Sequence, residues 1–268
     1  MDYIQLNDRT KMPLVGTGTN TFGKVDAEYR GELNGDFTPL ETALEVGYRL
    51  VDTAISYRNE AGVGHTAANS GVKRSEVFLT TKIPTDDQYT VSEDAVHQTI
   101  EQSLDHFETD YLDLYLVHHP FDSMKRLKLV WSVLEEYYEK GILKSIGVSN
   151  FTEAMIEEMK SFAKVMPEVN QIQSNPTEWN DDLIAYLQKE NIAVTAWSPL
   201  KAEKAQRQQL AEIGQRYNKS WAQVLLRYHV QRGVVVIPKS HNREHQVDNL
   251  AIFDFELSSE DKAKIKAL

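Results

Sequence analysis

The sequence contains no cysteine among its 268 residues, and this absence excludes several kinds of chemistry. Disulfides, zinc sites with thiolate ligands and thiol nucleophiles are ruled out, and we expect no metal site. Long apolar runs are also absent, because no stretch reaches the about 18 apolar residues of a transmembrane helix. The first residues, MDYIQLNDRTKMP, have neither the basic start nor the apolar centre of a secretory signal. We therefore predict a cytoplasmic protein that does not bind membranes.

Positive charge is in short supply in this sequence. The chain has 29 Lys and Arg residues against 40 Asp and Glu residues, which gives a formal net charge of −11. Nucleic-acid binding needs a basic face, so we predict that it is absent. Any phosphate ligand must be held by a local cluster of donors against the overall negative field. The expected partner is a small molecule, and nothing in the sequence indicates an obligate interface, so a monomer is predicted.

A break in composition is absent too, because no linker or low-complexity segment divides the chain. We therefore predict a single domain over residues 1–268. Short β-rich runs alternate with amphipathic segments of helical period. Strands are expected at 13–18, 48–52, 77–82, 112–118, 143–149, 169–173, 192–197 and 234–238. Helices are expected at 37–46, 59–70, 91–107, 123–140, 152–164, 180–190, 204–232 and 242–250.

This alternation predicts an α/β fold of a particular kind. Eight strands, each followed by a helix, in roughly 250 residues are typical of a (β/α)8 TIM barrel. The stretch YIQLNDRTKMP predicts an N-terminal β-hairpin, and ELSSEDKAKIKAL predicts an extra C-terminal helix capped by Ser258 or Ser259. The alternative, an open doubly wound sheet, wants a glycine-rich loop that opens the first helix. The first strand gives GTGTNTFG instead, which is not GxGxxG and which no helical run follows at once.

Polar or aromatic groups repeatedly interrupt or end the predicted strands. In a TIM barrel the carboxyl ends of the strands form the functional rim. Taken alone, each group has an ordinary explanation: Asp as a turn cap, Lys as a solvated charge, His or Tyr as a packed side chain. Seven such positions on one rim nevertheless indicate a built site. They are Asp52, Lys82, His118 with His119, Ser149 with Asn150, Asn170 with Gln171, Trp197 with Ser198, and Lys239 with Ser240.

Four side chains near these ends form a combination with a chemical purpose. An ammonium beside a phenol favours the phenolate, so Lys82 is expected to lower the pKa of Tyr57 from its usual value of about 10. Asp52 would keep Lys82 charged and in place. His118 would orient a carbonyl substrate at the same hydroxyl. Together they would make a proton donor that works near neutral pH without a metal or a thiol.

Nine short motifs follow one another along the chain: GTGTNTF, LVDTAISYRNE, TTK, YLDLYLVHHP, GVSNF, VNQIQSNP, AWSPL, IPKS and FDFELSSED. Through them the chain resembles the aldo-keto reductase family over essentially its whole length, in particular bacterial-type members that reduce diketogluconate or glyoxal. The resemblance implies a (β/α)8 barrel that transfers hydride from NADPH to aldehydes and ketones. It implies Tyr57 as the general acid, and Asn59 and Glu60 as structural residues that begin the next helix. The implied catalytic residues are Asp52, Tyr57, Lys82 and His118.

The same resemblance implies a set of cofactor contacts. Ser149, Asn150 and Gln171 match positions that hydrogen-bond the nicotinamide carboxamide. Trp197 matches an aromatic position that stacks on the nicotinamide ring. The other implied cofactor-binding positions are Thr19 and Asn20, Ser198 and Leu200 at the pyrophosphate, Lys239 and Ser240 at the 2′-phosphate, and Asp248 and Asn249 at the adenine.

Departures from the family pattern bear on both cofactor and substrate. His245 stands where the family commonly has an arginine that clamps the 2′-phosphate, and a neutral histidine lacks the arginine fork. We expect NADPH with a weakened preference and some use of NADH. Asn20 and His119 stand where tryptophans are usual, so we expect a polar pocket, with Phe22 among its apolar walls. Such a pocket would favour a keto-sugar acid, a dicarbonyl or a small aldehyde.

Two other functions fit part of the pattern. A regulatory protein could keep the barrel and the nucleotide site as a vestigial reductase, although the complete catalytic set argues against it. A barrel aldolase could use Lys82 as a Schiff-base amine. The neighbouring Asp52 would keep that amine protonated, which opposes nucleophilic use. A requirement for reduced nicotinamide separates the reductase from the aldolase, and loss of turnover in Tyr57→Phe separates it from the regulatory protein.

Overall fold

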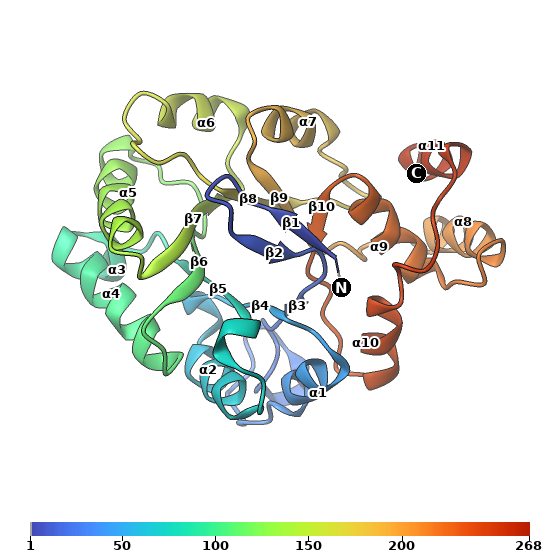
Figure 1. The fold of residues 1–268 in the computed structure, drawn as a ribbon, viewed down its shortest axis with the longest axis horizontal. Helices are drawn as coiled ribbons and strands as arrows, with labels where there is room; N and C mark the ends of the chain where they lie inside the picture. Colours follow the sequence, from blue (N-terminus) through green and yellow to red (C-terminus); the bar gives the residue numbers. More distant parts are fainter. Residues whose placement is uncertain (1) are drawn as a thin grey trace.

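The computed structural model describes residues 2–268, and its centre is a ring of parallel strands (Figure 1). Within these residues, eight strands pair in the order β10-β9-β8-β7-β6-β5-β4-β3, so each strand lies beside its neighbour in sequence. The segment just before β3 meets β10 through a parallel bridge between Val15 and Val236. There Gly16 N donates to Val236 O at 2.8 Å. This contact closes the sheet, and the predicted (β/α)8 barrel is confirmed.

The barrel strands are short and largely buried. β5 is buried along its full length, as expected of a parallel strand with helices on one side and the barrel interior on the other. The predicted ranges overlap all eight barrel strands and differ most at β3, which begins four residues later than predicted. The observed bounds are β3 Thr17–Gly18, β4 Leu50–Asp52, β5 Phe78–Ile83, β6 Leu112–Val117, β7 Leu143–Ser149, β8 Val169–Gln173, β9 Ala193–Trp197 and β10 Val234–Val236.

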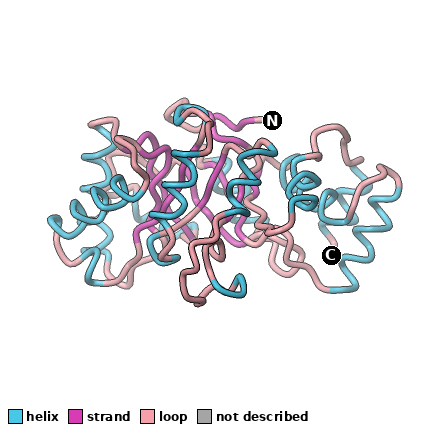
Figure 2. Tube along the Cα trace, turned by 90° about the horizontal axis from the view of Figure 1, so that it is seen from below, coloured by secondary structure: helices cyan, strands magenta, loops and turns pink. Residues whose placement is uncertain are grey.

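Helices surround the strands, as the tube view shows (Figure 2). The helix α4 illustrates why they begin where they do, because Ser92 Oγ accepts a hydrogen bond from Ala95 N at its first turn. No helix within residues 2–268 is both long and apolar enough to cross a membrane. The bounds are α1 Thr38–Val46, α2 Glu60–Asn69, α3 Asp87–Thr90, α4 Glu93–His106, α5 Met124–Glu139, α6 Glu153–Met159, α7 Asp181–Lys189, α8 Lys204–Gln215, α9 Trp221–Gln231, α10 Arg243–Leu250 and α11 Ser259–Lys266.

The segment predicted as one helix over 204–232 is two helices, α8 and α9. Ser220 and Gln223 form a capping box, in which Ser220 Oγ accepts from Gln223 N and Gln223 Oε1 accepts from Ser220 N. Both flanks are amphipathic, so periodicity does not reveal the break, whereas the S-x-x-Q signature does.

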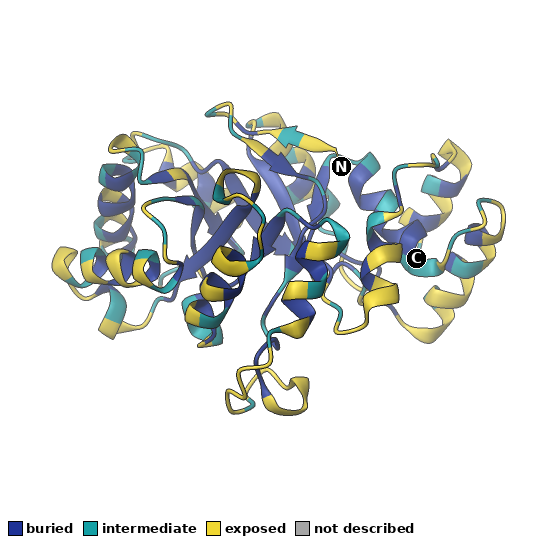
Figure 3. Ribbon diagram, turned by 60° about the horizontal axis from the view of Figure 1, so that its bottom comes forward, coloured by how far each residue is buried: buried dark blue, intermediate teal, exposed yellow. Residues whose placement is uncertain are grey.

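Opposite ends of the barrel are covered differently. The strands β1 (Tyr3–Gln5) and β2 (Lys11–Pro13) form the predicted N-terminal hairpin, which lies across the amino-terminal ends of the barrel strands (Figure 1). Leu6 and Met12 from this hairpin pack into an apolar cluster with barrel residues such as Leu114. At the other end, the loop 24–36 between β3 and α1 projects as a largely exposed segment (Figure 3). The predicted extra C-terminal helix is α11, capped by Ser258.

Candidate active site

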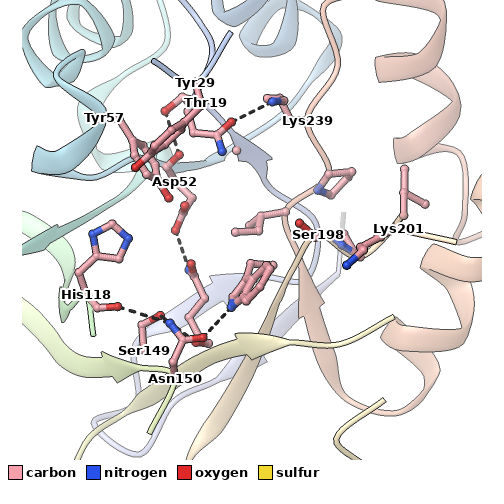
Figure 4. A pocket seen from close by; sticks show the side chains of 18 of the residues that line it. Thr19, Tyr29, Asp52, Tyr57, His118, Ser149, Asn150, Ser198, Lys201 and Lys239 are labelled. Atoms are coloured by element: carbon pink, nitrogen blue, oxygen red, sulfur yellow. Dashed lines mark hydrogen bonds between the residues drawn. The ribbon is translucent and has the colours of Figure 1, made fainter. Parts of the chain in front are cut away.

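A cavity of about 440 Å³ opens at the carboxyl ends of the barrel strands, where the predicted site residues converge (Figure 4). Asp52, Tyr57, His118 and His119 line it. Lys82 does not, because its side chain is fully buried beneath the cavity floor. Of the predicted cofactor-binding residues, those that line the cavity are Thr19, Asn20, Ser149, Asn150, Gln171, Trp197, Ser198, Leu200 and Lys239.

A buried ion pair lies at the base of the cavity, where Asp52 lines the cavity and Lys82 lies beneath it. β4 and β5 are neighbours in the ring, so Asp52 at the end of β4 lies beside Lys82 on β5. Lys82 Nζ donates to Asp52 Oδ1 at 2.6 Å and to the backbone oxygen of Thr53 at 2.7 Å. Gln171 Nε2 donates to Asp52 Oδ2 at 2.7 Å. Both carboxylate oxygens are therefore hydrogen-bonded, which offsets the cost of burying two charges.

Gln171 thus has a partner that sequence reasoning did not anticipate. It was predicted only as a contact of the nicotinamide carboxamide, yet it lines the cavity and also holds Asp52 in place. Burial lowers the pKa of Lys82, and the carboxylate of Asp52 opposes that shift. The pKa of Lys82 therefore depends on Asp52, and Gln171 holds Asp52 in the position where it acts.

Tyr57 lies above this pair, at the end of the short 3₁₀ helix η2 (Ile55–Tyr57) that follows β4. Its ring centroid is 5.2 Å from Lys82 Nζ and 5.6 Å from the ring of His118, which it meets edge-on. Burial, and next the negative charge of Asp52, raise the pKa of Tyr57 well above its usual value. The expectation of a lowered pKa is wrong, because burial dominates and the ammonium of Lys82 donates its hydrogen bonds to Asp52 and Thr53, not to the phenol. The phenol therefore keeps its proton until a strongly basic oxygen takes it.

His118 is a buried neutral imidazole. Burial, with smaller effects from Lys82 and His119, lowers the pKa of His118 to about 2. Its Nδ1 atom has no hydrogen-bond partner within residues 2–268. The ring stacks on His119, with centroids 4.5 Å apart. A neutral ring of this kind can hydrogen-bond a carbonyl oxygen without adding charge to the site.

One hydrogen-bonded chain connects the residues predicted to hold the nicotinamide. Asn150 Nδ2 donates to Ser149 Oγ at 3.0 Å, and Asn150 Oδ1 accepts from Trp197 Nε1 at 2.8 Å. Ser149 Oγ donates in turn to the backbone oxygen of Gln171 at 2.9 Å. The chain fixes the orientation of the Trp197 indole at the cavity wall, as stacking on a planar ring would require.

Cations mark the far rim of the cavity. Lys239 Nζ donates to Asn20 Oδ1 at 2.9 Å, so this lysine has a neutral partner rather than a carboxylate. Lys201, which sequence reasoning did not single out, also lines the cavity and follows Ser198 and Leu200. Two lysines that line the cavity of an acidic chain supply cations of the kind that phosphate groups would need.

Four of the predicted cofactor residues do not line the cavity. Ser240 Oγ accepts from Asn242 N at 3.0 Å, and Asn242 Oδ1 caps α10 by accepting from His245 N at 3.0 Å. Asp248 is exposed on the same helix, and Asn249 is buried. The roles assigned to Ser240, His245, Asp248 and Asn249 stay predictions.

One expectation about a neighbouring residue needs correction. Phe22 is completely buried and packs edge-on against His241, with ring centroids 5.0 Å apart, so the prediction that it forms a wall of the substrate pocket is wrong. Asn59 stands at the start of α2, as expected, and its Nδ2 donates to the backbone oxygens of Thr19 and Phe22, at 2.8 and 3.1 Å. It therefore ties the loop after β3 to the loop after β4.

Tyr29 lines the cavity although nothing in the sequence pattern indicated it. It lies in the loop 24–36, whose polar and glycine-containing sequence KVDAEYRGELNGD carries no strand or helix period. Its ring meets Tyr57 edge-on with centroids 5.8 Å apart. Only the folded loop brings it to the site.

The (β/α)8 barrel thus holds, at the carboxyl ends of its strands, a cavity with a buried acid–lysine pair and a phenol above that pair. Residues 14–268 match the model of the Aldo/keto reductase family, and the chain belongs to that family.

Similar proteins cover nearly the whole chain. It is 38% identical over 269 residues to the glyoxal reductase of Bacillus subtilis (strain 168), and the alignment covers 100% of this chain and 92% of that protein. It is 35% identical over 268 residues to the methylglyoxal reductase DkgA of Yersinia pestis, with 99% and 92% covered. The solved structure of the Bombyx mori aldo-keto reductase in complex with NADP resembles it with a TM-score of 0.89 at 34% identity, and covers 99% of this chain and 92% of that one.

Proposed function

We propose that this protein reduces aldehydes or ketones to alcohols with NADPH, and that Asp52, Tyr57, Lys82 and His118 carry the reaction. The observation that carries the proposal is the position of Tyr57. Its protonated phenol lines the cavity, with His118 at its edge and the buried Lys82–Asp52 pair behind it. Membership of the aldo/keto reductase family supports the same activity.

The residues present fit a nicotinamide dinucleotide. Trp197 offers a fixed aromatic face to a planar ring, and Lys201 and Lys239 offer cations to phosphates. A similar structure was solved in complex with NADP, which supports NADPH, and we keep some use of NADH in the proposal because of His245. When bound, the reduced nicotinamide supplies the hydride that reaches the carbonyl carbon.

The chain's own residues then handle the oxygen of the substrate. Tyr57 donates its phenolic proton to the oxygen as negative charge develops there. His118, neutral and beside that phenol, holds the carbonyl in line by a hydrogen bond. Lys82 stabilises the phenolate left behind, since its charge lies 5.2 Å from the ring. Asp52 holds Lys82 in this position.

The substrate class in this proposal is a small polar carbonyl compound. Asn20 and His119 give the cavity polar walls, as expected from the sequence. Two relatives are named for reducing glyoxal and methylglyoxal, and both substrates are small dicarbonyls. Methylglyoxal is therefore the first substrate to test.

The proposal has further parts that concern the whole protein. We propose a single domain over residues 1–268, supported by a family match that spans residues 14–268. We also propose a cytoplasmic monomer that does not bind nucleic acid. The net charge of −11 supports the last point, because nucleic-acid binding needs a basic face.

The test is the loss of reduced-nicotinamide absorbance with NADPH and methylglyoxal, in the unaltered protein and in Tyr57→Phe. Loss of the proton donor should lower kcat by roughly 10²- to 10⁴-fold, while NADPH still quenches tryptophan fluorescence. Tyr3→Phe, an exposed tyrosine on the hairpin at the opposite end of the barrel, is the matched control and should keep full activity. Equal turnover by Tyr57→Phe would refute the assigned role. Tight NADPH binding without turnover by the unaltered protein would favour the regulatory alternative.

A further inference from the structure

The loop 24–36 is held on the barrel by more contacts than a solvated connection requires. At its base, Gly23 N donates to Asp36 O and Asn34 N donates to Gly23 O, both at 2.9 Å. Val25 N donates to Glu32 O at 2.9 Å, so the two sides of the loop pair. Gly23 has φ of +71°, and a Cβ there would meet the ring of Phe37 at 2.4 Å. The loop therefore leaves the barrel in a defined direction.

Lys24 holds the tip of this loop from the inside. Its side chain is buried, and Nζ donates to the backbone oxygens of Asn20 at 2.9 Å and of Tyr29 at 2.5 Å. The same ammonium lies 4.9 Å from the centroid of the Tyr29 ring. Burial, with the nearby charges of Arg58 and Lys239, lowers the pKa of Lys24 to about 8. A buried lysine is costly, and this one contacts both the backbone and the ring of Tyr29.

Arg58 holds the next residues of the tip from the catalytic side. It follows Tyr57 directly, and its backbone is left-handed, with φ of 62°. Its Nη2 atom donates to the backbone oxygens of Arg30 at 3.3 Å and of Gly31 at 2.9 Å. Arg58, the neighbour of Tyr57 in sequence, thus binds Arg30 and Gly31, which follow Tyr29. These hydrogen bonds join the backbone near one tyrosine to the backbone near the other.

The consequence is that Tyr29 has a fixed place at the cavity although the residue is 46% exposed. It lines the cavity and meets Tyr57 edge-on at 5.8 Å, and Figure 4 shows the two side by side. Within residues 2–268, no hydrogen bond joins the Tyr29 hydroxyl to another residue, so the fold itself gives this hydroxyl no role.

We infer that Tyr29 is a specificity-determining residue, which hydrogen-bonds an oxygen on the carbon next to the reacting carbonyl. Lys24 and Arg58 are positioning residues that hold the loop for this contact. A substrate whose carbonyl oxygen faces Tyr57 and His118 then meets a second phenol when it carries a neighbouring oxygen. Dicarbonyl and hydroxycarbonyl compounds are selected over simple aldehydes in this way. The inference rests on the proposed reductase function and names the feature of its substrate that the loop selects.

The test compares kcat/KM with NADPH for methylglyoxal and propanal, which differ in one oxygen beside the aldehyde. The variant Tyr29→Phe removes only the hydroxyl. It should lower kcat/KM for methylglyoxal by roughly five- to tenfold, the usual effect of one hydrogen bond, and leave propanal within about twofold. Lys24→Met keeps Tyr29 but removes both hydrogen bonds of the ammonium and its contact with the Tyr29 ring, and should also lower the methylglyoxal-to-propanal ratio. Tyr3→Phe should leave the ratio unchanged.

The outcomes separate the inference from the function on which it rests. An unchanged ratio in Tyr29→Phe, with both substrates turned over, would overturn the inference and leave the reductase intact. An equal loss with both substrates would also overturn it, because Tyr29 would then act through Tyr57. Turnover of neither substrate by the unaltered protein would overturn the proposed function and the inference together. Thermal melting of Lys24→Met shows whether the fold is intact, and Tyr29→Phe keeps the test decisive if that variant unfolds.

Discussion

The two ends of the barrel each bury a carboxylate, but the hydrogen-bond partners of the two carboxylates differ in charge. At the carboxyl ends of the strands, Asp52 has the ammonium of Lys82 at 2.6 Å. At the amino-terminal ends, beneath the hairpin, Glu168 is equally buried and has no lysine or arginine among its hydrogen-bond partners in residues 2–268. Asp8 N donates to Glu168 Oε2 at 3.2 Å, and Ser145 Oγ donates to Asp8 Oδ2 at 2.5 Å.

This difference shows that burial alone does not decide what a carboxylate does. Burial, and next the like charge of Asp8, raise the pKa of Glu168 to about 7. At the other end the opposite charge of Lys82 lets a charged pair stay buried behind Tyr57. We call the end with Asp52 and Lys82 the charged end, because its carboxylate is paired with an ammonium. We call the end with Glu168 the titrating end, because the pKa of its carboxyl lies near neutral pH; the hairpin covers this end. The following substitutions test that contrast.

The largest effect is expected from Lys82→Met, which removes the cation at the charged end. The uncompensated Asp52 should cost about 3–5 kcal/mol of unfolding free energy, and turnover should be lost. The double variant Asp52→Asn with Lys82→Met should recover most of the stability without recovering activity. Urea unfolding followed by tryptophan fluorescence, and the NADPH assay, measure the two effects. If Lys82→Met were as stable as the unaltered protein, Lys82 would not offset the cost of burying the charge of Asp52.

At the titrating end, Glu168→Gln should raise the stability of the fold, whereas Lys82→Met lowers it at the charged end. The folded-state pKa is raised from 4.5 to about 7, so the stability that protonation provides is full below pH 4.5 and is lost as pH rises through 7. The amide removes this dependence. At pH 8 the variant should be more stable by roughly 1–3 kcal/mol, and near pH 5 the gain should largely vanish.

Unfolding curves at several pH values measure this prediction, with activity as the control. Activity should be unchanged, because Glu168 lies at the end of the barrel away from Tyr57. A stability difference that does not vary with pH would contradict the assigned titration. A fall in turnover would show that the two ends are not independent.

The smallest effect is expected at the outer rim of the charged end, from His245→Arg. A guanidinium can hold the 2′-phosphate with two hydrogen bonds, so the ratio of kcat/KM with NADPH to that with NADH should rise by about tenfold. His65→Arg, on the exposed surface of α2, is the matched control and should not change the ratio. An equal rise with both cofactors would place His245 away from the 2′-phosphate.

Local pattern predicted much of this molecule because the physics involved is local or nearly so. Strand and helix periods and short connections specify a barrel, and parallel strands bring their carboxyl ends to one rim. Asp52 and His118 could therefore be placed at one site from their positions at strand ends, and Tyr57 from its place in the loop that follows Asp52. The helix break near Ser220 was equally readable from its capping box, although amphipathic period alone concealed it.

Other features depend on contacts between distant segments, which periodicity does not encode. Phe22 faces the core instead of the cavity, Gln171 bonds Asp52 from another strand, and Tyr29 reaches the site on a loop that Lys24 contacts. The direction of a side chain in a loop is set by such long-range packing.

The sequence by itself determined the barrel and most of the residues that meet at its rim. Only the tertiary structure decided how those residues behave. The pKa of Tyr57 is the clearest case, since adjacency to Lys82 predicted a lowered value and the structure raises it. A pKa depends on burial and on which group an ammonium bonds, and both are properties of the folded chain.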